Sequence, residues 1–466
     1  MVAMPFFLFE QGRPCSSAVS QDYTRLVVSV NVAAVTCQDS AMKKNVLVFP
    51  CGAENSLEIH AALSHSLHVR LWGASSVEDH GYLAFGNYIG GLPSINQTNF
   101  LPNFTDMLKK HSIDLVLPTH DTVTLFLAQN VGKLPSRLAA PGVDFCRLAR
   151  YKSQLYARLA HLPFCPHVYV AGEDIPLPVF CKPDAGQGGK GTRLAHTRAE
   201  LHKALAEPGM LAVEYLPGEE YTVDCFTDRH GSLLFTGPRS RDRVRAGIAC
   251  STRTQPCTSD ILQIAHCLNR ELTPRGLWFF QIKRDTSGQW KLLEISGRVA
   301  SSMALYRQRG INFPLLTVLD ALNYDVRILD NGFPLGMDRC LRNRYAVDMP
   351  FDTVYVDYDD TVTCDEGRNA RPFAMLFLYR CARAGKNIVL LSRHAGDLYE
   401  DMRRLKIEPA LFSRIVQLPP DSGKKSNVIA PGPAIFVDNH FPERLEVHTS
   451  CGIPVFDVDA LELFLN

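Results

Sequence analysis

Residues 180–193, FCKPDAGQGGKGTR, carry glycines that fit two different phosphate-binding patterns. Gly186, Gly188 and Gly191 match the dinucleotide fingerprint G-x-G-x-x-G, whereas the Gly-Lys pair at 189–190 nearly completes a P-loop. A dinucleotide fingerprint needs a helix that starts within the glycines, and a P-loop needs Ser or Thr directly after its lysine. The neighbouring sequence therefore decides which fold the stretch belongs to.

The residues that follow the glycines fit neither pattern. No Ser or Thr follows the lysine directly, and TRLAH (192–196) is typical of a short strand. The next helix is predicted to begin only at Thr197, where T-R-A-E forms a capping box. What remains is a strand, a glycine-rich loop and a second strand, with Lys182 just before the loop. Such a loop can fold its backbone N–H groups over a triphosphate, although the glycines alone fit a structural turn equally well.

The composition describes a multidomain globular protein. A chain of 466 residues exceeds a single core, so we expect two to four domains. The net charge of +1 gives no reason to expect a nucleic-acid partner. The 14 cysteines include no C-x-x-C pair, which argues against zinc and thioredoxin-like sites and suits a reducing cytoplasm. The apolar run 26–35 is about half a membrane span, so we expect no membrane association.

The first 41 residues are assigned no function. They lack the basic region of a signal peptide and reach Glu10 early. Met42 begins MKKNVLVFPCG, which resembles a natural start that runs directly into a strand. We therefore expect residues 1–41 to be an N-terminal extension or a consequence of start-site choice.

The rest of the chain divides by pattern into three units. Residues 42–145 alternate strands and helices and predict a parallel α/β sheet, residues 146–345 are strand-rich and predict an α+β unit, and residues 351–466 are α/β again. In the first unit we predict strands at 45–50, 68–75 and 113–121 and helices at 56–66 and 103–112. In the second we predict strands at 169–183, 191–197, 210–228, 231–237 and 278–296 and helices at 198–206, 258–273 and 313–323.

Three motifs of the second unit occur in a recognisable order. They are K-P-x-x-G-x-G-G-x-G (182–191), E-Y-L-P-G-E-E-Y (214–221) and the hairpin QIKRDTSGQWKLLEISGR (281–298). This order resembles the ATP-grasp superfamily, and its carbamoyl-phosphate-synthetase-like, carboxylate–amine ligase branch in particular. The resemblance covers roughly residues 45–330. It implies a Rossmann-like pre-ATP-grasp domain followed by an ATP-grasp fold.

The resemblance also implies an ATP site. Lys152 and Lys182 stand where the family places its phosphate-contacting lysines, with Gly188 and Gly189 in the loop over the phosphates, while Lys190 is a lesser candidate. The segment Glu214, Tyr215 and Leu216 would be the hinge that contacts adenine. Glu220 would accept hydrogen bonds from the ribose. Taken singly, Lys152 would more often be a solvated helix residue and Glu220 a surface charge, so the assignment depends on their joint order.

Metal and phosphoryl-transfer roles follow from the third motif. Gln281 and Glu294 would hold Mg²⁺, a hard cation that prefers oxygen ligands. Arg298 would steady the transferring phosphoryl group. The family usually has Asn two residues after the metal-binding Glu, and here Ser296 stands there. Because of that difference, binding of a second metal ion at this site is in question.

The segment 237–254 holds five arginines, which are either a solvated face or an acceptor site. In ATP-grasp ligases this region commonly faces the acceptor. Arg239 and Arg253 are therefore the candidates for binding a carboxylate substrate.

Polar residues end the predicted strands of the third unit. TVYVDYDDTVT (353–363) places Asp357, Asp359 and Thr361 at a strand end, and Ser392 and Asp438 end two further strands. Together with a lysine in GKKSNVI, this D-x-D-x-T, Ser, Lys, Asp order resembles the haloacid dehalogenase (HAD) superfamily. The gaps between the motifs are too short for a cap domain, so the resemblance implies a capless HAD-like α/β domain.

The HAD resemblance implies a Mg²⁺-dependent phosphohydrolase. Asp357 would attack phosphorus and Asp359 would be the general acid and base. Mg²⁺ would be held by Asp357, Asp438 and the backbone carbonyl of Asp359. Ser392 and Lys425 would hold the phosphoryl oxygens, with Lys424 as the competing lysine.

The whole chain is thus expected to be a cytoplasmic two-headed enzyme that uses ATP and Mg²⁺. Its first activity would join a small carboxylate and an amine through an acyl phosphate, and its second would hydrolyse a phosphorylated small molecule. One alternative is an ATP-grasp kinase without an amine step. Another is an ATP-sensing module that regulates a phosphatase. The identities of the substrates and the presence of a homodimer are left open.

Overall fold

The structure is a computed structural model that describes residues 43–465 except Ala171, Gln187, Ala246, Ala346 and the segments 341–343 and 420–422. The predicted extension 1–41 lies outside the described residues.

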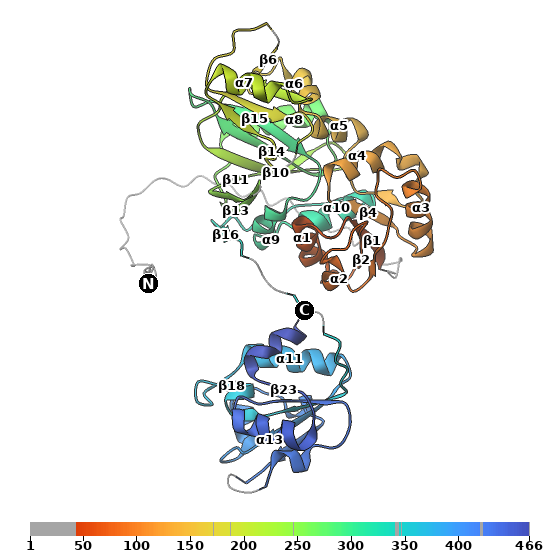
Figure 1. Cartoon of the computed structure of the whole chain (residues 1–466), viewed down its shortest axis with the longest axis vertical. Coiled ribbons are helices and arrows are strands. Elements are labelled where there is room, and N and C mark those ends of the chain that lie inside the picture. The colour runs from red at the N-terminus through yellow and green to blue at the C-terminus, as the bar shows by residue number, and fades with distance from the viewer. Residues whose placement is uncertain are drawn as a thin grey trace, which may run out of the picture. The chain divides into compact units, whose positions relative to one another are not determined.

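The first sheet is parallel and carries two cores. Its strands run in the order β3-β2-β1-β4-β5, of which β2, β1 and β4 are labelled in Figure 1. Alternate residues of β1 face different cores, with Val46 and Val48 in one hydrophobic cluster and Leu47 and Phe49 in another. The elements are β1 (Lys44–Phe49), α1 (Glu54–Leu63), β2 (Val69–Ala74), α2 (Gly81–Ala84), β3 (Tyr88–Ile89), α3 (Phe100–Lys110), β4 (Leu115–Pro118), α4 (Asp121–Gln129) and β5 (Arg137–Leu138).

The middle of the chain is built from antiparallel strands. One sheet has the order β6-β9-β7-β8, a second β11-β10-β14-β15 and a third β12-β13-β16. The helices are α5 (Val143–Arg150), α6 (Lys152–Leu159), α7 (Arg198–Leu205), α8 (Ser259–Leu272), α9 (Ala304–Gln308) and α10 (Phe313–Ala321). The strands are β6 (Val168–Tyr169), β7 (Val179–Pro183), β8 (Arg193–Ala195), β9 (Met210–Val213), β10 (Glu220–Thr227), β11 (Leu233–Ser240), β12 (Arg243–Arg245), β13 (Ile248–Arg253), β14 (Gly276–Arg284), β15 (Trp290–Ser296) and β16 (Gly336–Asp338).

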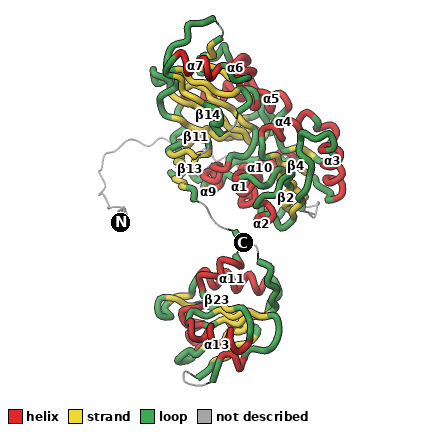
Figure 2. The backbone as a smooth tube through the Cα atoms, viewed as in Figure 1, coloured by secondary structure: helices red, strands yellow, loops and turns green. Residues whose placement is uncertain are grey.

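The last sheet is parallel and repeats the strand order of the first. It runs β21-β20-β17-β22-β23, so in both sheets the third, second, first, fourth and fifth strands lie side by side. Helices flank its strands (Figure 2): α11 and α12 pack on the core of Val354 and Val356, and α13 packs on that of Tyr355. The elements are β17 (Thr353–Val356), β18 (Thr363–Cys364), β19 (Asn369–Ala370), α11 (Pro372–Arg383), β20 (Asn387–Ser392), α12 (Leu398–Arg404), β21 (Arg414–Gln417), β22 (Ala434–Val437), α13 (Phe441–Cys451) and β23 (Val455–Phe456).

The predicted mixed α/β character is confirmed. The largest difference lies in the expected strand 169–183, which is interrupted between β6 and β7. Within the described ranges, every helix is too short or too polar to cross a bilayer.

Candidate functional site

The glycine-rich loop joins two antiparallel strands, as the sequence predicts. Strands β7 and β8 pair, and α7 begins only at Arg198 behind its Thr197 cap. Gly188, Gly189 and Gly191 have φ angles of +60°, +69° and +77°. Side chains rarely adopt this left-handed region, so the loop needs glycine at these positions. Its shape is that of a flap and not of a helix-starting nucleotide fingerprint.

Two buried lysines approach this loop from different elements. Lys152 begins α6 and donates to the Gly186 carbonyl over 3.2 Å, and its Nζ lies 3.9 Å from a carboxylate oxygen of Glu294. Lys182, in β7, donates to the Tyr156 hydroxyl and to the Leu293 carbonyl. The structure therefore brings both predicted phosphate-contacting lysines to one place. Tyr156 was not foreseen, because a tyrosine on an amphipathic helix carries no distinguishing signal.

Burial lowers the pKa of Lys182. Its removal from water, together with the positive charge of Lys152, lowers the pKa of Lys182 to about 7. Glu294 opposes this shift only partly. An anionic ligand beside Lys182 would restore its charge, which is what a phosphate-binding lysine needs.

Gln281 and Glu294 face each other across the β14–β15 hairpin. They are direct partners in the antiparallel register, as expected from the sequence. In the part of the chain that the structure describes, no three His, Cys, Asp or Glu side chains group into a metal centre. One carboxylate and one amide oxygen still fit Mg²⁺, since this ion is commonly held by one or two carboxylates together with substrate phosphates.

Ser296 and Arg298 share a carboxylate that the sequence did not single out. The Ser296 hydroxyl donates to Asp121 over 2.8 Å, and the Arg298 Nε lies 3.1 Å from the same oxygen. Asp121 begins α4, directly after a strand of the first sheet. Its place after the run LVLPTH was the available signal. The helix that follows β4 therefore contributes a residue to the neighbourhood of the predicted phosphoryl-transfer site.

The predicted adenine hinge follows β9. The backbone N–H of Glu214 donates to the His167 carbonyl, and its carboxylate accepts from the His167 N–H. Leu216 is buried and Tyr215 is half-buried. The hinge carboxylate is thus fixed to the chain rather than pointing freely into a site.

Glu220 begins β10 and is held by two cations. Arg241 Nε lies 2.5 Å from one of its oxygens, and Lys283 Nζ lies 3.8 Å from the other. Arg241 also donates to the Gly247 carbonyl. A Cβ on Gly247 would lie 2.2 Å from the Gly188 Cα, so the turn after β12 touches the glycine-rich loop backbone to backbone. Arg241 was overlooked among the five arginines because a charge run does not show which member turns inward.

The two arginines chosen as substrate contacts each form an ion pair with an aspartate of the chain. Arg239 is 1% exposed and forms a two-contact ion pair with the buried Asp224 at 2.7 and 3.1 Å. Arg253 is exposed and pairs with Asp242 at 3.0 Å. The structure gives Arg239 an internal role within the sheet, since its charge is balanced by Asp224.

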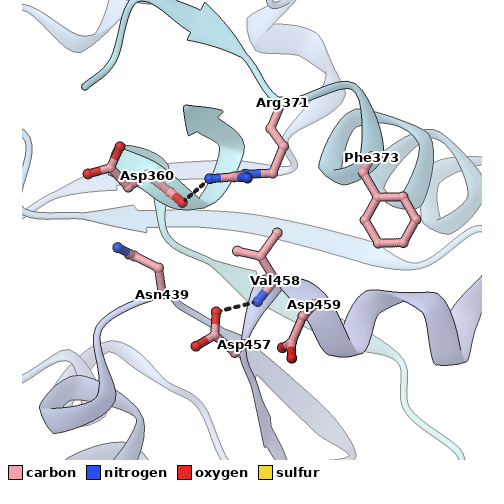
Figure 3. Close-up of a pocket in the computed structure, with 7 residues that line it drawn as sticks. All are labelled: Asp360, Arg371, Phe373, Asn439, Asp457, Val458 and Asp459. Carbon is pink, nitrogen blue, oxygen red and sulfur yellow. Dashed lines mark hydrogen bonds between the residues drawn. The ribbon is translucent and has the colours of Figure 1, made fainter. Parts of the chain in front are cut away.

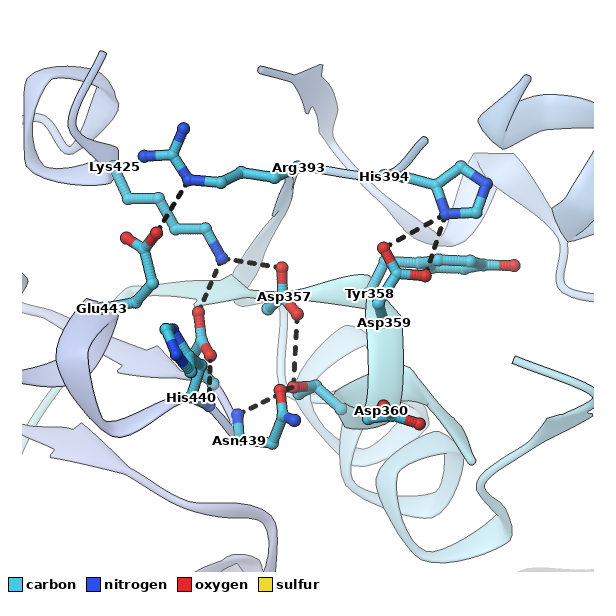
Figure 4. Close-up of polar contacts among 12 residues, drawn as sticks. Asp357, Tyr358, Asp359, Asp360, Arg393, His394, Lys425, Asn439, His440 and Glu443 are labelled. Atoms are coloured by element: carbon cyan, nitrogen blue, oxygen red, sulfur yellow. Dashed lines mark hydrogen bonds and ion pairs between the residues drawn. The ribbon is translucent and has the colours of Figure 1, made fainter. Parts of the chain in front are cut away.

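The second cluster lies at the carboxyl ends of the last sheet (Figure 4). Asp357 follows β17, Ser392 ends β20 and Asp438 follows β22, so parallel strands bring them to one edge. Lys425 donates to Asp357 over 2.7 Å and to Asp438 over 2.6 Å. Lys424 is two-thirds exposed and points to Glu446, 3.9 Å away. Of the two candidate lysines, Lys425 is the one in the cluster.

Burial also governs the charges of this cluster. It raises the pKa of Asp357, and the nearby Asp438 adds to the rise, while Lys425 opposes it. Burial lowers the pKa of Lys425, but its two carboxylate partners outweigh that effect and the net shift is upward. The ion pair with Lys425 thus favours the ionised form of Asp357 against the effect of burial. Two carboxylates at one edge also fit the coordination of Mg²⁺.

Asp359 turns away from Lys425 toward His394. The imidazole Nδ1 of His394 lies 2.9 and 3.2 Å from the two Asp359 oxygens (Figure 4). Thr361 donates to Asn439 over 3.0 Å and accepts from its backbone N–H. His394 and Asn439 were not predicted, although each stands within two residues of a predicted site residue.

Two cavities open beside this edge. The larger, of about 510 Å³, is lined in part by Asp360, Arg371 and Asn439, and the Arg371 guanidinium donates to the Asp360 carbonyl (Figure 3). The smaller, of about 180 Å³, is lined in part by Asp359 and His394. Asp359, which lines the smaller cavity, is therefore accessible from solvent.

Comparisons with known proteins identify the fold of the part of the chain that carries the glycine-rich loop and the β14–β15 hairpin. The family described as "ATP-grasp in the biosynthetic pathway with Ter operon" matches residues 206–332. Among curated proteins none matches the sequence.

Solved structures agree with this match. N5-carboxyaminoimidazole synthetase from Staphylococcus aureus, complexed with ADP, is similar with a TM-score of 0.54 and 13% identity over 65% of this chain and 83% of that chain. The biotin carboxylase domain of the Hydrogenobacter thermophilus 2-oxoglutarate carboxylase, in complex with MgADP, ADP and bicarbonate, gives a TM-score of 0.52 and 15% identity over 62% of this chain and 72% of that chain. At such identities the likeness establishes the fold alone. Together with the family match, it shows that the chain contains an ATP-grasp domain.

Proposed function

We propose that residues 42–345 form an ATP- and Mg²⁺-dependent carboxylate–amine ligase, with a pre-ATP-grasp domain at 42–145 and the ATP-grasp domain at 146–345. The observation that carries the proposal is the meeting of Lys152, Lys182 and Glu294 around the glycine-rich loop. Two buried ammonium groups beside a carboxylate on a hairpin suit a triphosphate with its cation. The ADP complexes of the structural neighbours support the nucleotide.

The reaction would have two steps. A substrate carboxylate oxygen attacks the γ-phosphorus of ATP, the bond to the β-phosphate oxygen breaks, and ADP leaves. An amine nitrogen then attacks the acyl carbon, the carbon–oxygen bond to phosphate breaks, and the amine loses a proton. Arg298 would face the charge that spreads over the transferred phosphoryl group, and Lys152 and Lys182 would hold the remaining phosphates. Bound Mg²⁺ would neutralise the phosphate oxygens beside Gln281 and Glu294.

An ADP-release screen tests this activity. Amino acids and small carboxylates would be supplied with ATP to the Asp357→Asn protein, which removes the second proposed activity. Hydroxylamine should trap an acyl phosphate as a hydroxamate. ADP release without a hydroxamate would instead establish the kinase alternative. ATP binding with no substrate-dependent ADP release would favour the sensing module.

We further propose that residues 351–466 form a capless HAD-like phosphohydrolase. The observation that favours it is Lys425 held between Asp357 and Asp438 at the carboxyl ends of adjacent parallel strands. Asp357 attacks phosphorus, the bond to the leaving oxygen breaks, and a proton from Asp359 completes the alcohol. Water then attacks the aspartyl-phosphate, gives its proton to Asp359 and releases inorganic phosphate. Bound Mg²⁺ would offset the charge of the phosphoryl oxygens.

Hydrolysis of p-nitrophenyl phosphate tests the second activity. The full chain with Mg²⁺ should release p-nitrophenol, and Asp357→Asn should abolish the release. Equal release by both proteins would assign it to a contaminant and defeat the proposal.

A further inference from the structure

We propose that His394 is a positioning residue that holds Asp359 in the smaller cavity, where the leaving group of the phosphate ester departs. The inference rests on the proposed phosphohydrolase activity. It goes beyond that activity because it adds a residue outside the D-x-D-x-T, Ser, Lys, Asp set and gives it a separate role.

The contact between the two side chains is direct. His394 Nδ1 lies 2.9 Å from one Asp359 oxygen and 3.2 Å from the other. With Nδ1 protonated, the imidazole donates to the ionised Asp359 carboxylate, and it can still donate to the carbonyl oxygen when the other oxygen carries the proton for the leaving group. A single donor near both oxygens restricts rotation of the carboxylate about its last bond. Asp359 needs this restriction, because its side chain is 47% exposed and would otherwise sample several rotamers.

His394 is itself firmly held. Its side chain is only 14% exposed, and its ring lies edge-on to Tyr358 with centroids 5.3 Å apart. Tyr358 in turn donates from its hydroxyl to Asp401 over 3.0 Å. The Gln417 side chain donates to the His394 carbonyl over 2.8 Å, which fixes the backbone as well. An imidazole that is held through its ring and through its backbone can keep the Asp359 carboxylate in place.

The cavity indicates what Asp359 is positioned for. Asp359 and His394 both line the space of about 180 Å³, and Gly367 of the β18–β19 hairpin lines it as well. Lys425, which donates to both Asp357 and Asp438, does not line this space, and neither does Asp438. A phosphoryl group held at Asp357 by Lys425 would therefore direct its ester oxygen toward Asp359. Positioning matters most for the proton that Asp359 gives to that oxygen, since general acid catalysis requires hydrogen-bond reach.

The test uses two esters that differ in their need for an acid. The p-nitrophenolate ion leaves readily without a proton, whereas phenolate is a stronger base and gains more from protonation. For both esters kcat/KM reports the steps up to cleavage of the ester bond. We expect His394→Ala to lower kcat/KM for phenyl phosphate about tenfold or more, and to lower it much less for p-nitrophenyl phosphate.

Two conservative variants show which ring nitrogen of His394 makes the hydrogen bond to Asp359. The amide nitrogen of asparagine can take the place of Nδ1, and that of glutamine can take the place of Nε2. His394→Asn should recover most of the phenyl phosphate activity, and His394→Gln should recover little. A purely structural role would lower both esters equally, and a urea unfolding midpoint matching wild type would show that the fold is intact.

Two results would overturn the inference. These are an unchanged ratio of kcat/KM between the two esters in His394→Ala, whether or not both values fall, and recovery by Gln but not by Asn. Failure of the proposed phosphohydrolase looks different: wild type and Asp357→Asn would then be indistinguishable on both esters.

Discussion

The Ser296 hydroxyl donates to Asp121 over 2.8 Å, although Ser296 ends β15, Asp121 begins α4 and the two lie 175 positions apart in the chain. Both side chains are largely buried, and Arg298 pairs with the same carboxylate. The position at which the ATP-grasp resemblance expects Asn is used here to hold an acid from α4, the helix that follows β4. Ser296, which stands where the family usually has Asn, therefore has a hydrogen-bond partner in Asp121.

A double-mutant cycle should reveal this coupling. Ser296→Ala and Asp121→Ala together should destabilise the protein less than the sum of the single changes, by about 1–2 kcal/mol, because a buried hydrogen bond to a charged group is lost only once. The free energy of unfolding in urea measures it. Ser287→Ala removes a comparable bond to Asp285 on an exposed turn and should have a smaller effect. Additive single changes would mean that the contact contributes nothing.

ATP binding should become pH-dependent through Lys182. Its pKa of about 7 in the free protein should rise when phosphates lie beside it, so binding takes up a proton above pH 7. ATP affinity should then fall as pH rises above about 7 and stay level below it. Calorimetry in two buffers of different ionisation enthalpy measures the proton uptake. Lys190→Met, at an exposed loop position, should leave the pH dependence unchanged, and a flat profile in wild type would contradict the assignment.

The contact between Gly247 and Gly188 should be needed for nucleotide binding. Gly247→Ala would force a Cβ to 2.2 Å from the Gly188 Cα, so the glycine-rich loop must shift. We expect ATP affinity to fall about tenfold, measured by displacement of a fluorescent nucleotide. Gly288→Ala is the matched control, because Gly288 has a similar φ of +81° but open space around it. Equal losses in both variants would point to backbone strain alone.

Substitution of the adjacent residues Lys424 and Lys425 by Met should lower the stability of the protein by very different amounts. Lys425→Met leaves Asp357 and Asp438 buried without their cation and should cost about 3–5 kcal/mol of stability. Lys424→Met removes a two-thirds exposed group and should cost little. Thermal unfolding of both variants checks the difference. Similar melting temperatures would show that Lys425 is not the buried partner of the two acids.

Local chemistry made much of the fold predictable. The capping box at Thr197 and the missing hydroxyl after Lys190 are enough to exclude two nucleotide folds, and α7 begins where the cap places it. Apolar runs ending in acids placed Asp357 and Asp438 at strand ends, because parallel strands bring such ends together.

The sequence did not predict which side chains pair across long distances in the chain. The arginine-rich segment gave no sign that Arg239 would meet Asp224 inside a sheet while Arg241 turned toward Glu220. Both partners come from another strand, and their register depends on backbone pairing rather than on local composition. His394 was missed for the same reason, since its role depends on a side chain that lies far from it in the chain.

The shared strand order of the two parallel sheets has a consequence for how freely their loops can vary. In both sheets the loops after the first and fourth strands diverge at one edge. In the first sheet this edge is tied to the ATP-grasp domain, because Asn55 donates to Thr119 and Val299 at 2.7 and 3.1 Å. Insertions there would disturb the proposed ATP site, which is built on another sheet. Beyond the opposite edge, where Leu67 is 78% exposed, mutation is free of that constraint and relatives should differ most.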